Sequence, residues 1–175
     1  MLQSPVVEEW RFCPVCGRDL DHLGSRENPY VKCRECEFFR YNNPLPTTIG
    51  VIEDEGKYLL VRRAIAPELG KWDSVGGFLA PGERAEECLA REAREEIDCE
   101  LENIRPIGSY ASIYGSTGLR TVGFAFTCSL ARGSRIKLSS ENSEYHWFRP
   151  EEIPVLAFED VRRAVADVVG GRQHG

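Results

Sequence analysis

The chain has 175 residues, of which 42% are hydrophobic and 29% are charged, and its net charge at pH 7 is −6. This length can bury a core and accommodates one domain, or one domain with a small added module. The acidic balance argues against nonspecific binding to nucleic acid, and no apolar run is as long as a membrane span, so we expect neither partner.

Four of the seven cysteines form two C-x2-C pairs separated by sixteen residues, namely Cys13 with Cys16 and Cys33 with Cys36. Four thiolates complete a tetrahedral Zn2+ site and leave no position open for a substrate. We therefore predict a structural zinc ribbon whose folding energy is supplied by the metal. A redox pair or two disulfides is the alternative, which the presence of two such pairs disfavours.

The same cysteines indicate a reducing compartment. The other three, Cys88, Cys99 and Cys128, are scattered, which is typical of buried thiols rather than of a secreted disulfide framework. The first twelve residues also lack the long apolar segment of a signal peptide. We expect a cytoplasmic protein.

The predicted ribbon is nearly neutral. Residues 11–40 contain six basic and five acidic side chains, so their net charge of +1 is no footprint for nucleic acid. We interpret His22 as a surface residue, because the four cysteines already fill a zinc shell. We expect the ribbon to scaffold a homodimer or to form one wall of a substrate pocket.

The segment NNPLPTT at 42–48 contains an Asn-Pro and a Pro-Thr pair, which are typical of a linker between two parts of a chain. We predict a zinc ribbon with an N-terminal extension (1–41), a main domain (42–170) and a flexible tail (171–175). The main domain is expected to begin with a hairpin whose turn is at 54–56. The expected strands are 49–52, 58–61, 75–79, 104–113, 120–130 and 145–148, and the expected helices are 83–97, 149–154 and 158–169. These strands and helices do not alternate regularly along the chain, which indicates an α+β sandwich.

The helix at 83–97 has a buried stripe and a cluster of acids beside it. Leu89, Ala93 and Ile97 recur every fourth residue and form the stripe. The acids are Glu92, Glu95 and Glu96, and they share one face of the helix. Each like-charged pair on such a face destabilises the helix by roughly 0.2–0.5 kcal/mol. A solvated surface is the ordinary explanation of such a cluster. The glycines just before the helix and the grouped oxygen ligands favour a Mg2+ or Mn2+ site instead.

These residues resemble the Nudix box, G-x5-E-x7-R-E-U-x-E-E-x-G-U, in which U is apolar. Gly77, Glu83, Arg91 and the three glutamates all match, and Asp98 stands where the pattern has its last glycine. That glycine ends the helix with a positive φ, which Asp tolerates better than most residues, so we expect a modest local cost.

The likeness covers nearly the whole chain, from Cys13 to about Val169. GKWDSVGGFLAPGE at 70–83 is similar to the family's lead-in, and EYHWFRPEEIP at 144–154 is similar to its C-terminal signature. The ribbon followed by YNNP resembles the zinc-ribbon branch, which includes NADH pyrophosphatases and FAD or ADP-ribose pyrophosphatases. The resemblance implies a Nudix-like α/β/α sandwich with a mixed sheet, preceded by a small zinc ribbon.

The resemblance also implies a metal site. Glu92, Glu95 and Glu96 would bind catalytic Mg2+ or Mn2+, and the backbone carbonyl of Gly77 would be a further ligand. Arg91 would orient the helix carboxylates. The number of metal ions is left open.

Further roles are implied outside the helix. One box glutamate, or an acid from a later loop, would be the general base, with Glu144 as first candidate and Glu141 as second. Arg62 would meet a phosphate, although a surface ion pair is an equal alternative for Arg62 and Glu144. Tyr110 and Tyr114 can stack on a base or a flavin, although strand aromatics more often belong to a core.

One further segment of the sequence narrows the range of expected substrates. NADH pyrophosphatases carry Ser-Gln-Pro-Trp-Pro-Phe-Pro after the box, and GSYASIYGSTGL at 108–119 matches it only at Ser109. We therefore expect a small nucleotide, ADP-ribose or FAD rather than NADH, cleaved within its diphosphate to AMP and X-phosphate. One alternative is a pyrophosphohydrolase of nucleoside triphosphates or RNA caps. Another is a non-catalytic ribbon protein that binds nucleic acid or regulates transcription, for which three metal-binding acids have no use.

Overall fold

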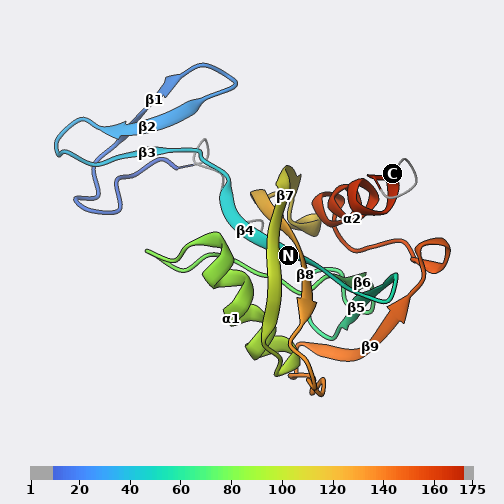
Figure 1. Ribbon diagram of the computed structural model, residues 1–175. Coiled ribbons are helices and arrows are strands. Elements are labelled where there is room, and N and C mark those ends of the chain that lie inside the picture. Colours follow the sequence, from blue (N-terminus) through green and yellow to red (C-terminus); the bar gives the residue numbers. More distant parts are fainter. Residues whose placement is uncertain (1–9, 172–175) are drawn as a thin grey trace.

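The computed structural model describes residues 10–171, which form a small sheet followed by a larger sheet with helices (Figure 1). The small sheet contains β1 (Leu20–Gly24), β2 (Pro29–Cys33) and β3 (Phe39–Tyr41). The larger sheet contains β4 (Leu45–Asp54), β5 (Lys57–Arg63), β6 (Trp72–Asp73), β7 (Leu101–Ile113), β8 (Arg120–Leu130) and β9 (Asn142–Phe148). The helices are α1 (Ala85–Ile97) and α2 (Glu159–Gly171), with short 3-10 turns η2 (Gly115–Thr117) and η3 (Pro150–Glu152).

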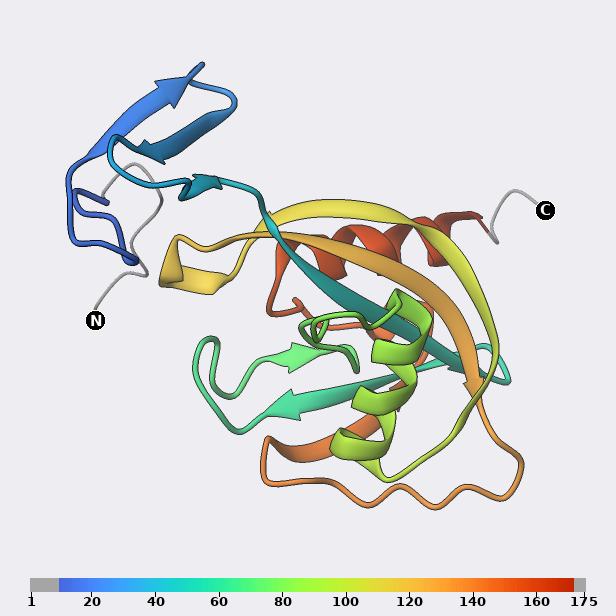
Figure 2. The ribbon, with the colours of Figure 1, turned by 90° about the vertical axis from the view of Figure 1, so that its left-hand side faces the viewer.

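The larger sheet is mixed. Its strands are ordered β6-β5-β4-β8-β7, and β9, which lies off this path, also pairs with β5. Strands β4 and β8 run parallel from the pair Leu45↔Thr121 to the pair Ile52↔Cys128, whereas the remaining pairs are antiparallel. Figure 2 shows β7 and β8 curving together across the length of the domain. The predicted mixed sheet is therefore confirmed.

The two helices lie on opposite faces of this sheet. Along β5, Tyr58 and Leu60 join the core cluster of α2, while Leu59 and Val61 join the core cluster of α1. Because successive strand residues point to opposite faces, this alternation places one helix on each face. The arrangement is the predicted α/β/α sandwich (Figure 2).

Helix α1 is held against β4 by its apolar stripe. Leu89, Ala93 and Ile97 are fully buried, as predicted. A Cβ at Gly50 of β4 would lie 2.8 Å from Leu89 Cδ1, so the glycine permits the close approach of helix and strand. The helix ends at Asp98 in the left-handed conformation, with φ 55° and ψ 39°, as expected for this departure from the glycine pattern. This packing fixes the direction in which the acidic face of α1 points.

One predicted strand is wrong. The expected strand at 75–79 is replaced by β6 at Trp72–Asp73, and Val75 and Phe78 form only isolated bridges to Gly50 and Thr47. The physical reason is the close approach of Gly76 to β4, where a Cβ would overlap the Thr48 carbonyl. This segment therefore follows β4 through single hydrogen bonds, from the Gly50 amide to the Val75 carbonyl and from the Thr48 amide to the Gly77 carbonyl, without the continuous register of a strand. In addition, α1 begins two residues later than predicted, and of 149–154 only η3 is helical.

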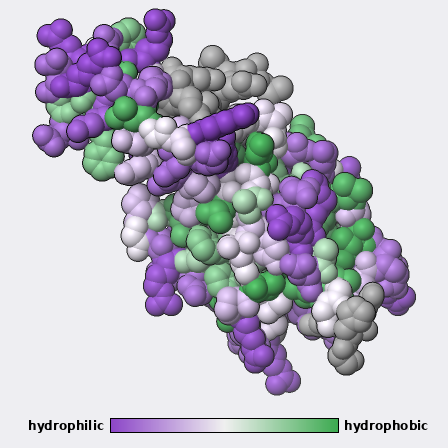
Figure 3. Space-filling model, turned by 90° about the horizontal axis from the view of Figure 1, so that it is seen from above, coloured by the Kyte–Doolittle hydropathy of each residue, from purple (hydrophilic) through white to green (hydrophobic). Residues whose placement is uncertain are grey.

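The ribbon projects from one end of the larger domain (Figure 1), and its surface is mainly hydrophilic when seen from above (Figure 3). We keep the division at residues 41 and 42 as a proposal. The predicted N-terminal extension at 1–9 and most of the tail, 172–175, lie outside the described residues, while Gly171 is the last residue of α2. Among residues 10–171, no helix is both long and apolar enough to cross a membrane.

Candidate active site and zinc cluster

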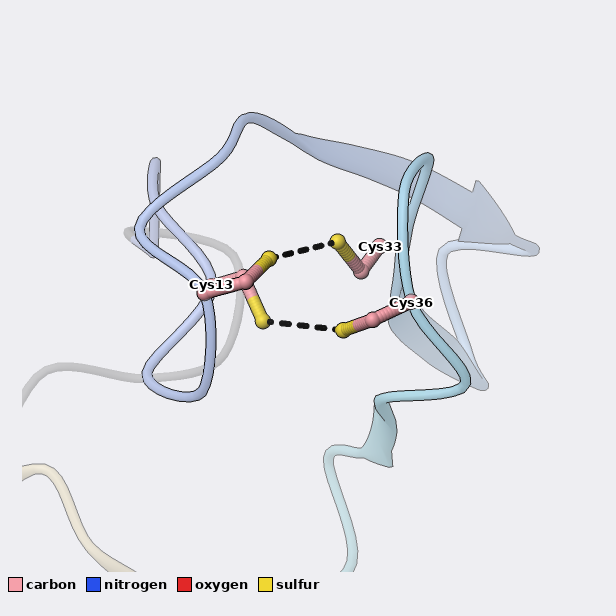
Figure 4. Close-up of side chains that lie close together, drawn as sticks. Cys13, Cys33 and Cys36 are labelled. Atoms are coloured by element: carbon pink, nitrogen blue, oxygen red, sulfur yellow. Dashed lines mark hydrogen bonds between the residues drawn. The ribbon is translucent and has the colours of Figure 1, made fainter.

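The four ribbon cysteines come together in space. Cys13 and Cys16 flank the turn before β1, Cys33 ends β2, and Cys36 lies in the loop that follows β2. Their sulfur atoms all lie within 4.8 Å of one another, with 3.6 Å between Cys13 and Cys36 and 3.5 Å between Cys16 and Cys33. Tetrahedral zinc with Zn–S bonds near 2.3 Å separates its sulfurs by about 3.8 Å. All four thiols are free, and three of them are labelled in Figure 4, converging on one point. The donor set therefore fits Zn2+. His22 is exposed and is not one of this group.

A second group of side chains surrounds a cavity of about 300 Å3 in the larger domain. Helix α1 contributes acids to it, β4 contributes its first residues, and α2 contributes its N-terminal turn. The residues predicted from sequence that line it are Gly77, Glu92, Glu95, Glu96, Tyr114 and Glu141. Sequence reasoning missed Arg63, Asp73, Phe78, Phe158 and Asp160, which also line it.

Gly77 makes room for the nearest carboxylate. A Cβ at this position would overlap the Glu92 carboxylate, so glycine lets the loop pass close to α1 without displacing that side chain. The Gly77 carbonyl accepts a hydrogen bond from the Thr48 amide at 2.8 Å, and the Cys88 thiol donates weakly to it at 3.8 Å. Carboxylate and carbonyl oxygens are the ligands that Mg2+ and Mn2+ prefer. The residues present therefore fit a divalent cation here.

Arg91 ties the acids of this site together. Its Nη1 donates to Glu92 Oε1 at 2.8 Å and to Glu95 Oε2 at 2.9 Å. Its Nε and Nη2 donate to the two oxygens of Glu83 at 2.8 and 3.0 Å, and Nη2 also donates to the Phe78 carbonyl at 3.1 Å. Such a bidentate pair fixes both partners in direction as well as in distance. This geometry supports the predicted orienting role of Arg91.

Glu83 is held as an anion by this contact. The Arg91 guanidinium, followed by the Ala80 amide, lowers the pKa of Glu83 to about 2. A carboxyl whose pKa is lowered on folding stabilises the fold above its unfolded pKa, and this contribution disappears as pH falls towards its folded pKa.

We therefore expect Glu83→Gln to lower the free energy of unfolding at pH 7 and to lower it much less at pH 3. Urea unfolding of both proteins at the two pH values measures this. Glu86→Gln, a substitution at an exposed position on the first turn of α1, is the matched control. A destabilisation by Glu83→Gln that is the same at both pH values would contradict the ion-pair assignment.

The remaining acids are crowded and partly removed from water. Burial raises the pKa of Glu96 well above its ordinary value, and the charges of Asp73, Glu92 and Glu141 act in the same direction. Burial also raises the pKa of Glu92, which the neighbouring Arg91 opposes. A cluster of this kind favours a bound cation, because a cation offsets both the repulsion and the lost hydration.

Part of the cavity lining is aromatic. Tyr114 stacks on Phe158 with ring centroids 4.9 Å apart and planes 15° apart, and Phe78 meets the Tyr114 ring edge-on at 5.2 Å. Tyr110 is not brought to the cavity, because it is buried under α2 and its hydroxyl donates to Asp167 at 2.7 Å. Of the two predicted stacking tyrosines, only Tyr114 is therefore in reach of a ligand in the cavity.

Arg62 and Glu144 also lie away from the cavity. They are paired across β5 and β9, at 3.4 Å, with about half of each side chain exposed, so they form the surface ion pair considered from sequence. The neighbouring Arg63 lines the cavity instead, where it pairs with Asp73 at 3.1 Å. The register shift between Arg62 and Arg63 sets which arginine points inward, and a strict period of two does not hold at a bulge.

Comparison with known proteins agrees with this geometry. The NUDIX domain family model matches residues 44–168. The NAD-capped RNA hydrolase NudC of Pseudomonas fluorescens strain Pf0-1 is 30% identical over 170 residues, which are 97% of this chain and 59% of that protein. NudC of Vibrio atlanticus is 30% identical over 152 residues, covering 87% of this chain and 54% of that protein. The chain thus spans less than two thirds of the length of these curated relatives.

Solved structures show the same fold. A NUDIX hydrolase from Nitrosomonas europaea has a TM-score of 0.74 and 29% identity, covering 95% of this chain and 94% of its own. A MutT NUDIX hydrolase from Burkholderia pseudomallei has a TM-score of 0.66 and 23% identity, covering 72% of this chain and 98% of its own. With the family model matching most of the sequence, the conclusion is that the chain belongs to the NUDIX domain family.

Proposed function

We propose that this chain is a Mg2+- or Mn2+-dependent hydrolase that cleaves the diphosphate of a nucleotide linked to another moiety. ADP-ribose and FAD are the proposed substrates, and AMP and X-phosphate are the products. The observation that carries the proposal is one cavity lined both by the acids of α1 and by Tyr114 and Phe158. The acids suit the phosphates of a nucleotide through a divalent cation, and the rings suit its base.

Individual residues would have the following roles in the reaction. Glu92, Glu95 and Glu96 would hold the cation, which supplies neutralisation of phosphate charge and a water of lowered pKa. Arg91 would position Glu92 and Glu95 without touching the substrate. Glu141 replaces Glu144 as our candidate for a base from a later loop, because Glu141 lines the cavity and its charge acts on Glu96.

A second candidate substrate is an RNA that begins with a dinucleotide cap. The curated relatives named above are NAD-capped RNA hydrolases. In this chain, a groove of about 960 Å3 adjoins the cavity, sharing Ser112, Thr121 and Phe158 with it. The groove reaches Asn43 in the joint and Asn28 in the ribbon. An RNA attached to the cleaved diphosphate needs such a path out of the cavity. The groove is lined by three cationic side chains (Lys71, Arg120 and Arg162) and by three acidic ones (Glu27, Glu68 and Glu159). Two of the cations are paired, Lys71 with Glu68 and Arg162 with Glu159, so Arg120 is the cation of the three left to meet an RNA phosphate.

A panel assay tests these proposals. ADP-ribose, FAD, NADH, NAD, ATP and GTP are incubated with the protein and Mg2+ at equal concentrations, alongside NAD-capped and 5′-triphosphate RNA. We expect turnover of ADP-ribose or FAD to exceed that of NADH. Faster turnover of the NAD-capped RNA than of any free nucleotide would replace the first candidate by the second. Turnover of triphosphates alone would contradict both.

A further inference from the structure

The small sheet of the ribbon has two faces, and one of them forms the ribbon core. Val31 and Cys33 of β2 are buried in that core. Because successive strand residues point to opposite faces, Tyr30 and Lys32 point to the other face of the sheet. This second face is the one available to a partner.

Three aromatic rings lie together on the second face. The strand register pairs Tyr30 of β2 with Tyr41 of β3, and Phe39 lies opposite Lys32. The ring centroids of Tyr30 and Tyr41 are 5.2 Å apart, and those of Phe39 and Tyr41 are 5.7 Å apart. Phe39 is 57% exposed and Tyr41 is 43% exposed, whereas the wet face of an antiparallel sheet is usually polar. With Leu23, which pairs with Tyr30 from β1, these rings form a continuous surface that we call the aromatic face.

A second copy of the chain is too large an occupant for this surface alone. A stable protein interface buries roughly 800 Å2 and about 20–30 residues on each partner. The aromatic face offers four apolar side chains on three strands of five, five and three residues. A sheet with aromatic side chains of this extent suits two or three stacked bases of a single-stranded nucleic acid.

The groove that adjoins the cavity reaches the edge of the same sheet. Its lining includes Asn28 and Asn42, and the Asn42 amide donates to the Pro29 carbonyl at 3.1 Å. Tyr30 directly follows Pro29 and Tyr41 directly precedes Asn42, so this pair of rings lies at the groove end of the sheet. Figure 1 shows β3 leading through the joint into β4 of the larger domain. A polymer that leaves the cavity along the groove therefore meets the aromatic face.

One cation of the aromatic face is available for a phosphate. Lys32 is exposed and forms no ion pair within residues 10–171, whereas Arg34 is held by Asp21 at 2.6 Å. The ribbon as a whole is nearly neutral, so it attracts a nucleic acid only weakly over distance. Stacking on the rings, together with one phosphate contact, would hold the strand instead.

We propose that the aromatic face stacks the bases of a single-stranded RNA whose 5′ end occupies the cavity, and that Lys32 meets one of its phosphates. The inference rests on the second substrate candidate of the proposed function, RNA with a dinucleotide cap, and gives that RNA a second point of contact outside the cavity. A single strand is required, because the bases of a duplex are already stacked on one another. A ring of the protein stacks on any base, so the contact is tolerant of sequence.

Fluorescence anisotropy with a 3′-labelled, unstructured RNA of about 12 nucleotides tests this. The RNA carries a 5′-monophosphate, so it contains no diphosphate to be cleaved. Phe39→Ala and Tyr41→Ala are each expected to raise its Kd by roughly fivefold or more, because each removes one stacking ring. Phe12→Ala is the matched control and should keep the wild-type Kd, since this ring is 61% exposed on the ribbon but precedes β1 and lies outside the aromatic face. Lys32→Gln should reduce the slope of log Kd against log salt by about 0.7, the value for one phosphate of a single strand.

Wild-type RNA affinity in both Phe39→Ala and Tyr41→Ala would overturn the inference, as would equal affinity of the wild type for a duplex of the same sequence. Sedimentation velocity covers the other occupant. A wild-type dimer that these variants convert to a monomer, with unchanged RNA affinity, would assign the face to a second copy of the chain. Zinc content and thermal melting check that each variant is folded, and Phe39→Leu, which removes the ring but keeps an apolar side chain, replaces a variant that is not.

The binding assay is independent of hydrolysis. Ring-dependent RNA binding by a chain that hydrolyses no nucleotide would remove only the proposed function. Hydrolysis combined with RNA binding that ignores the rings would remove only the inference.

Discussion

Replacing Glu95 or Glu96 by glutamine is expected to lower kcat by roughly a hundredfold or more, as removal of one preorganised electrostatic group does elsewhere. A phosphoanhydride resists hydrolysis because charge must gather on oxygens that are already negative. A neutral amide at either position binds a divalent cation poorly, so this charge is left uncompensated. Steady-state kinetics with ADP-ribose and Mg2+ measures the effect.

The fold should survive both substitutions. Removing the Glu96 charge relieves repulsion from Asp73, Glu92 and Glu141, so the melting temperature of Glu96→Gln should stay the same or rise. Glu95→Gln relieves repulsion of Glu92 but loses the exposed pair with Arg91, so its melting temperature should change little. Glu86→Gln, on the same helix but exposed and outside the cavity, is the matched control and should keep wild-type kcat. Wild-type activity in Glu95→Gln or Glu96→Gln would remove these residues from the proposed metal site.

Replacing Cys13 by serine is expected to abolish zinc binding and to unfold the ribbon. The small core around Leu20 and Val31 includes three of the cysteines, and Trp10 and Phe38 are the only other side chains packed on it in the described residues, so the ribbon has little apolar core without the metal. Zinc binding to such modules is worth about 10–16 kcal/mol of folding free energy. Elemental analysis should find about one zinc per wild-type chain and far less in Cys13→Ser. Limited proteolysis should cut the variant within residues 10–41.

A control variant separates loss of metal from general loss of stability. Cys128 is buried in the core of the larger domain, so Cys128→Ser should lower the melting temperature and keep the zinc. Zinc-free wild-type protein with reduced cysteines and a protease-resistant ribbon would contradict the structural role of the metal.

Local patterns in the sequence predict much of this molecule. The period of Leu89, Ala93 and Ile97 predicts the buried face of α1, because a helix repeats every 3.6 residues whatever lies against it. The paired cysteines predict their own convergence, since four thiolates at this spacing suit one ion. The left-handed Asp98 follows from the backbone needed at a helix end. In each case the determining residues lie within one helix or within one small module of the chain, where the cysteines are at most 23 positions apart.

The rest depends on contacts that are remote in sequence. The choice between Arg62 and Arg63 rests on a bulge against β9, about eighty residues later in the chain. Tyr110 lies on β7, and Tyr114 directly follows that strand. Only the docking of α2 buries Tyr110 and leaves Tyr114 at the cavity. Phe158 belongs to the cavity because α2 returns to it across the sheet, which no local pattern indicates.

The most direct test is to separate the products formed from ADP-ribose in the presence of Mg2+. Cleavage within the diphosphate gives AMP and ribose 5-phosphate in equal amounts, and this is the expected result. The reaction should stop when EDTA removes the metal and should be nearly absent in Glu95→Gln. Release of pyrophosphate from triphosphates, with ADP-ribose and FAD intact, would contradict the proposed substrate class. Absence of turnover for every phosphoanhydride would contradict the proposed hydrolase and favour a binding role for the chain.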